Sequence, residues 1–215
     1  LERRSKERPR GVSLAELGGK TSDFTIGLAR KLRQRVQELT EKLEVFAPVY
    51  VVFTKADLIA GFAEFFEDRD RQERDQVWGA TLPYDPSGKA DAVAQFDRHF
   101  DELYEGLKDA SVARMSMQRG EQLPPGVLTF PLEFAAIKPS LRTFLTTLFE
   151  ENPYQFRPIF RGFYFTSAVQ EGHSTSRASD RVAQQFSLQL QEGTSASVYA
   201  QGGFFLKELF SKVIF

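Results

Sequence analysis

Residues 48–57 read PVYVVFTKAD, and this stretch decides the predicted fold. Its first part, Val49–Phe53, is a continuous run of apolar residues that favour β-structure, which is typical of a parallel strand buried on both faces. A helix is predicted before it, over residues 22–44, because leucine and valine recur there at spacings of four and three: Leu28, Leu32, Val36, Leu39 and Leu43. A helix, a buried strand and a further helical region in succession indicate an α/β domain.

The end of the strand carries the sharpest local motif, Thr54-Lys55-Ala56-Asp57. GTP-binding proteins read their base with a motif of the form Asn/Thr-Lys-x-Asp, in which the carboxylate accepts hydrogen bonds from guanine and the lysine stem lies over the base. The carboxyl ends of parallel strands are also where α/β folds bind ligands. The same four residues equally fit a polar turn that closes a strand and needs no ligand.

A second apolar strand is predicted over residues 159–165, with Gly162 as its weak point, and Thr166-Ser167-Ala168 follows it. In G domains the corresponding strand ends in a Ser-Ala loop that touches the base. We therefore predict that the two strands are parallel neighbours. Five residues, the candidate nucleotide-binding set, should then face one crevice: Thr54, Lys55, Asp57, Ser167 and Ala168.

A large helical insertion is expected between the strands, because Phe96, Phe100, Leu103 and Leu107 and later leucines recur at helical spacing, with breaks at residues 83–89 and 123–127. The fold class predicted is thus α/β, a partial G-domain-like parallel sheet with a large helical insertion and a helical C-terminal part. We expect the insertion to leave and return on the crevice side. Four regions follow from this: 1–61 with a charged arm at 1–10, 62–153, 154–180, and 181–215.

The chain contains 21 phenylalanines. This number exceeds what a narrow core stripe needs, so the insertion is predicted to offer an aromatic partner surface. The alternative is that these side chains are all buried within the helical part. The residues that decide between the two are Phe62, Phe65, Phe66, Phe96 and Phe100.

Phosphate binding has no support in this stretch of sequence. Gly18-Gly19-Lys20-Thr21 resembles the end of a phosphate loop, but Leu14 stands where the loop needs glycine and Ser13–Leu17 lacks a strand pattern. Ser87-Gly88-Lys89 is followed by Ala90, which has no hydroxyl for magnesium. We expect no cofactor in this region, and GTP or ATP with magnesium only through other parts of a complete protein.

Other functional classes are excluded by composition. There is no cysteine and only two histidines, His99 and His173, so a structural zinc site lacks ligands and no catalytic set is predicted. A net charge of −1 gives no field that would recruit nucleic acid. No run of about 18 apolar residues is present, so a membrane would be reached only through segments outside this chain. Leu1 is not an initiator methionine, which suggests a fragment.

Several blocks resemble, in order, the IcmF/TssM family of type VI secretion membrane proteins: Pro48–Glu67, Gln76–Leu82, Phe160–Gly172 and Phe204–Phe215. This resemblance implies a cytosolic, GTPase-like region on the cytoplasmic face of the bacterial inner membrane. It also implies TssL, TssJ and baseplate proteins as partners. Some members carry a phosphate loop before this region and others lack one. The function implied is a cytosolic scaffold; the alternative is a GTP or ATP hydrolase whose phosphate loop lies outside this chain.

Overall fold

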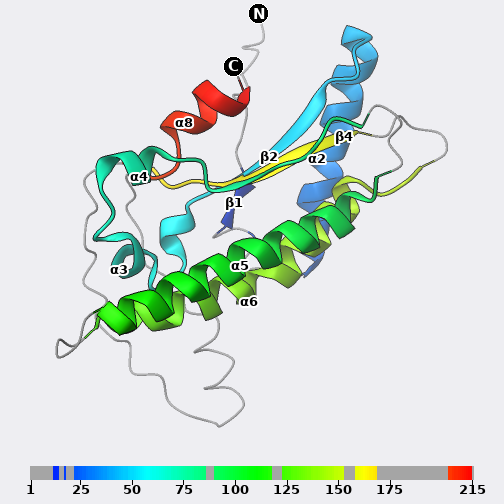
Figure 1. Cartoon of the computed structure of the whole chain (residues 1–215). Coiled ribbons are helices and arrows are strands. Elements are labelled where there is room, and N and C mark those ends of the chain that lie inside the picture. Colours follow the sequence, from blue (N-terminus) through cyan, green and yellow to red (C-terminus); the bar gives the residue numbers. More distant parts are fainter. Residues whose placement is uncertain are drawn as a thin grey trace, which may run out of the picture.

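The computed structural model describes residues 12–14, 17, 22–85, 90–117, 123–152, 158–168 and 203–214. Within them, helices pack against a sheet of strand order β1-β2-β4-β3 (Figure 1). In chain order the elements are β1 (Val12–Ser13), α2 (Ser22–Leu43), β2 (Pro48–Thr54), η1 (Ala56–Leu58), α3 (Phe62–Phe66), α4 (Arg71–Asp75), β3 (Gly79–Thr81), α5 (Ala92–Met117), α6 (Pro125–Leu148), β4 (Ile159–Phe165), α8 (Lys207–Leu209) and η2 (Phe210–Ile214).

Strands β2 and β4 are parallel neighbours, as predicted, with Val51 opposite Phe163 and Phe53 opposite Phe165. The sheet as a whole is mixed, however, because β3 pairs antiparallel with β4. The prediction that the insertion is helical was wrong here, since Gly79–Thr81 is a strand. A side chain at Gly79 would overlap the Phe163 carbonyl, so only glycine lets β3 approach β4 this closely.

The other edge strand, β1, was also missed. Val12 and Ser13 pair in parallel with Phe53 and Thr54 of β2. Two residues are too few to show the alternation by which a strand is recognised in a sequence. The prediction that Ser13–Leu17 is not a strand fails only at Ser13, where β1 ends, since Leu14 and Leu17 are helical. Gly18–Thr21 and the arm at 1–10 lie outside the described residues.

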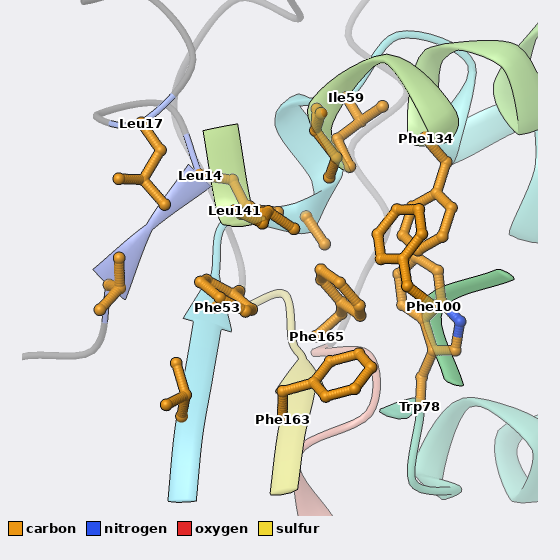
Figure 2. Packing of buried hydrophobic residues seen from close by; sticks show 14 of the residues in the cluster. Leu14, Leu17, Phe53, Ile59, Trp78, Phe100, Phe134, Leu141, Phe163 and Phe165 are labelled. Carbon is orange, nitrogen blue, oxygen red and sulfur yellow. The ribbon is translucent and has the colours of Figure 1, made fainter. Parts of the chain in front are cut away.

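The apolar core lies on one face of the sheet. Val51 and Phe53 of β2 are buried, whereas Tyr50 and Val52, which point the other way, are only partly buried. The expectation that this strand is buried on both faces was thus wrong. From β4, Phe163 and Phe165 lie near Phe100, Phe134 and Trp78, as Figure 2 shows.

Helices α5 and α6 run side by side along the sheet and form the main layer over this face (Figure 1). Their rings interlock: Phe100 and Phe134 stack with centroids 4.5 Å apart. Helix α6 begins at Pro125, inside the predicted break at 123–127, because a proline has no N–H to lose in the first turn of a helix.

The phenylalanines of the insertion do not form a partner surface. All five that decide the question are at most 5% exposed: Phe62, Phe65, Phe66, Phe96 and Phe100. The sheet, the α5–α6 pair and residues 203–209 meet around them, so the number of rings reflects a core that is enclosed on three sides. The predicted aromatic surface is therefore corrected to an aromatic core.

The insertion leaves the sheet after Thr54, at the carboxyl end of β2, and the chain re-enters at Ile159, opposite Pro48 at the amino end. The expectation that it leaves and returns on one side was wrong. Two parallel strands start at the same edge, so the chain between them must cross the whole sheet. At the far end of the chain, residues 207–214 are helical, as predicted for the C-terminal part.

Helix α2 ends one residue before the predicted bound and has a different buried face. Thr25, Ala29 and Arg33 are buried, whereas Leu39 and Leu43 are 57% and 64% exposed. The early turns pack on α6, and Arg33 forms an ion pair with Glu150 at 3.6 Å. The periodicity predicted the helix correctly, but it could not show that the helix extends beyond the body it packs against.

Candidate functional site

The loops after β2 and β4 lie together at the carboxyl edge of the sheet, as the parallel arrangement predicts. Two backbone hydrogen bonds join them: the N–H of Thr166 donates to the Phe53 carbonyl at 2.9 Å, and the N–H of Ala56 donates to the Thr166 carbonyl at 3.1 Å. The two loops that carry the predicted site residues are thus neighbours in space. Their binding role stays a prediction.

The closest contact at this edge joins Asp57 and Ser167. The Ser167 hydroxyl donates to Oδ1 of Asp57 over 2.5 Å, a short charge-assisted hydrogen bond. Burial raises the pKa of Asp57 above its ordinary value. The Ser167 hydrogen bond, the backbone N–H of Asp57 and the charge of Lys55 offset part of this rise. Since a carboxylate offers about four acceptor positions, Ser167 orients Asp57 without saturating it.

Lys55 has a left-handed backbone, with φ 64° and ψ 40°. This conformation costs a non-glycine residue about 1–2 kcal/mol. It starts the short helical turn Ala56–Leu58, in which the N–H of Leu58 donates to the Lys55 carbonyl at 3.1 Å. The strained turn is what brings Asp57 back towards β4 directly after the strand ends.

Thr54 faces β1 rather than β4. Its hydroxyl donates to the Val12 carbonyl at 3.4 Å, and Ser13 lies opposite it in the parallel pairing. Ser13 is 8% exposed, and its hydroxyl has no hydrogen-bond partner among the described residues. Thr54 therefore ties the strand ends together, while Asp57 and Ser167 tie the loops.

The residue that covers Ser167 was not predicted from the sequence. Phe204 forms a β-bridge with Ser167. The N–H of Ser167 donates to the Phe204 carbonyl at 3.0 Å, and the N–H of Phe204 donates to the Ser167 carbonyl at 2.8 Å. Ser167 is only 2% exposed, whereas Ala168 is exposed. An apolar block at Phe204–Phe215 was noticed in the sequence, but no local signal indicates a pairing partner so far away in the chain.

The same segment, Gly203–Leu209, also contacts the insertion. The N–H of Phe205 donates to the Arg74 carbonyl at 2.6 Å, and the Arg74 guanidinium lies 5.0 Å from the Phe204 ring centroid. Lys207 adds an ion pair with Asp75 at 2.8 Å. We call Gly203–Leu209 the C-terminal segment; it joins the carboxyl edge of the sheet to helix α4.

No group of three or more histidine, aspartate or glutamate side chains that could hold a metal ion occurs in the described part of the chain. His99 lies on α5, with Nδ1 2.7 Å from Glu102, and His173 lies outside the described residues, as does Ser87–Lys89. A surface hollow lined by Pro83, Asp85 and Pro158 lies near the start of β4, at the other end of the sheet from Asp57.

The comparisons with known proteins bear on this arrangement. The chain matches the family model of the IcmF-related N-terminal domain over residues 11–215. The chain belongs to this family. This confirms the resemblance seen in the sequence blocks. No solved structure matches the chain, so the likeness of the IcmF-related sheet to a G domain stays a prediction.

A curated relative agrees with the family. The chain is 37% identical over 228 residues to a Pseudomonas aeruginosa protein described as type VI secretion system component TssM1. The alignment covers 100% of this chain and 20% of that protein, so the chain spans about a fifth of its relative's length. Among the helices described here, none is long and apolar enough to cross a membrane.

Proposed function

We propose that this IcmF-related region is an assembly module of the type VI secretion machine, on the cytoplasmic face of the inner membrane. It links a membrane anchor in the longer protein to other secretion components, for which the family resemblance names TssL, TssJ and baseplate proteins. The relative described as TssM1 supports the assignment to this machine.

The observation that carries the proposal is the bridge between Ser167 and Phe204. One backbone donor that a base could use in the loop after β4 is the N–H of Ser167. That N–H already donates to Phe204, whose ring lies in the aromatic core. The carboxyl edge of the sheet is thus used to anchor the C-terminal segment, which is a structural task.

The experiment is Asp57→Asn in the complete protein, in a cell that produces the whole secretion machine. Asparagine keeps an acceptor for Ser167 but removes the charge. We expect the membrane complex to assemble and secretion to stay within about twofold, as for a conservative change that leaves the fold intact. Phe134→Ala is the matched control and should abolish assembly, because Phe134 is fully buried. Lost secretion with an assembled complex would contradict the assembly role.

The alternative function is nucleotide binding, with a phosphate loop supplied by residues outside this chain and magnesium bound with GTP or ATP. One observation favours it: the Ser167 hydroxyl orients Asp57 at the strand edge, as a base-reading carboxylate requires. Its test is base preference. A carboxylate pairs with the donors of guanine, whereas the amide of Asp57→Asn offers a donor to the extra carbonyl of xanthine. Binding of GTP by the parent and of XTP by the variant would establish the alternative.

A further inference from the structure

The apolar stripe of helix α2 does not end where the body of the domain ends. Ala29 is fully buried, and Leu32 and Val36 are partly buried. One turn further on, Leu39 and Leu43 are 57% and 64% exposed. Figure 1 shows this end of α2 projecting away from α5 and α6. We call Val36, Leu39 and Leu43 the α2 stripe.

The spacing within the α2 stripe is three and then four residues, which is the spacing of a seam between two packed helices. The exposed leucines lie one turn apart, so their side chains are neighbours on the same face. Val45, which follows the helix, is 56% exposed as well. The surface therefore has the shape that another helix can pack against.

Charges border the α2 stripe on one side. On a helical projection, Arg35 and Lys42 flank it on that side and Thr40 on the other, while Glu38 and Glu41 point to the far side. Arg35 also pairs with Glu38 at 3.0 Å, on the exposed surface. One side of the border thus carries Lys42 and the Arg35–Glu38 ion pair, and Thr40 on the other side is uncharged.

We propose that the α2 stripe docks an amphipathic helix of another subunit of the secretion complex, whose apolar face is bordered by aspartate or glutamate. The proposal rests on the assembly role proposed above and names a surface for it. Acidic residues complement Arg35 and Lys42, whereas a second copy packed antiparallel would place these cations against each other. Two turns of helix bury little area, so this docking is one contact among several that act together.

The first test uses two designed helical peptides with identical leucine seams, one bordered by glutamate and the other by lysine. Their binding to the complete protein is measured by fluorescence anisotropy. We expect the glutamate peptide to bind at least about tenfold more tightly, a difference of about 1.4 kcal/mol. Leu39→Gln/Leu43→Gln should abolish this difference. Leu128→Gln/Leu132→Gln, the same change at exposed leucines of α6, should leave it intact.

A charge reversal tests the border itself. Arg35→Glu/Lys42→Glu should invert the preference, so that the lysine peptide binds more tightly. Equal binding of the two peptides to the parent protein, or equal losses in the α2 and α6 leucine variants, would overturn the proposal. So would sedimentation showing that the protein self-associates and that Leu39→Gln/Leu43→Gln dissociates it, since the occupant would then be a second copy.

The source of the docked helix is tested by labelling. This chain has no cysteine, so Leu43→Cys adds a single thiol to it, and reaction with a maleimide reports whether the α2 stripe is covered. The same protein without the added cysteine gives the background. We expect the thiol to react in the purified complete protein and to be protected in the assembled complex. Protection already in the isolated protein would assign the occupant to the same polypeptide and overturn the proposal.

Failure of this proposal and failure of the assembly role give different results. If the α2 stripe stays open in the assembled complex, the docking proposal is wrong, while the Asp57→Asn experiment still decides between assembly and nucleotide chemistry. If Asp57→Asn abolishes secretion in an assembled complex, the assembly role is wrong even where the stripe is covered.

Discussion

At the scale of single residues, Lys55, Asp57 and Ser167 show how a strand end is closed. Lys55 adopts a left-handed backbone conformation, so the chain turns directly after the strand. This turn places Asp57 within hydrogen-bond distance of the Ser167 hydroxyl. The carboxylate is partly buried there, and burial raises its pKa. Its ionisation therefore weakens the folded state, although the hydrogen bond from Ser167 recovers part of the loss.

The first prediction concerns the pH dependence of this pair. The folded-state pKa of Asp57 lies above the unfolded value of 3.8, so the folded protein binds the proton more tightly, and stability falls as the pH rises through that window. Asp57→Asn is neutral throughout. Its melting temperature should exceed that of the parent at neutral pH, and the difference should shrink towards about pH 3, where Asp57 is protonated. A difference that does not change with pH would contradict the burial argument.

At the scale of elements, helix α2 shows how a helix ends without its preferred residue. Glu44 follows Leu43 with φ 52°, the left-handed conformation that commonly terminates helices and is usually taken by glycine. Glutamate is sterically strained in this conformation because it has a Cβ. The helix therefore ends at a strained residue, without the glycine that usually relieves the strain.

The second prediction follows from this strained stop. Glu44→Gly should raise the free energy of unfolding by about 1 kcal/mol, because glycine adopts the left-handed conformation without strain. Glu41→Gly, the same change within the helix, should lower it by about 1 kcal/mol. Urea denaturation of both variants measures the two effects. Equal destabilisation by both changes would show that the conformation of residue 44 is not the source of strain.

At the scale of the whole molecule, an aromatic core joins parts of the chain that are distant in sequence. Trp78 contacts Phe165 of β4 with ring centroids 4.9 Å apart, Phe134 of α6 at 5.1 Å and Phe205 of the C-terminal segment at 5.3 Å. The sheet, the insertion and the C-terminal segment therefore share one core. Removing a ring from one part should therefore also lower the stability of the other parts.

The third prediction uses Trp78 as a reporter, since it is the single tryptophan of the chain. Phe205→Ala should cost about 3 kcal/mol, because the ring is buried, and should shift the emission of Trp78 to the red as water reaches it. Phe210→Ala, in the same part of the chain but 49% exposed, is the control and should cost less than about 1 kcal/mol. An unchanged emission in Phe205→Ala would mean that the C-terminal segment does not cover the core.

Much of the fold could be predicted because its signals are local. The apolar run at Val49–Phe53 and the spacing of Phe96 and Phe100 are short-range patterns that identify a strand and a helix. The parallel pairing of β2 and β4 followed from chain order, and it placed Asp57 and Ser167 at one edge before any contact was known. Their hydrogen bond bears out the placement, though not a ligand.

By itself, the sequence determined the long helices, the two central strands, the family and the residues at the carboxyl edge, because each leaves its signal in short stretches of the chain. Only the tertiary structure decided that β3 joins the sheet, that Phe204 covers Ser167, and that Leu39 is exposed while Phe100 is buried. These outcomes depend on which distant segments meet. Periodicity shows that a helix has an apolar face, but what covers that face is decided by the packing of the whole chain.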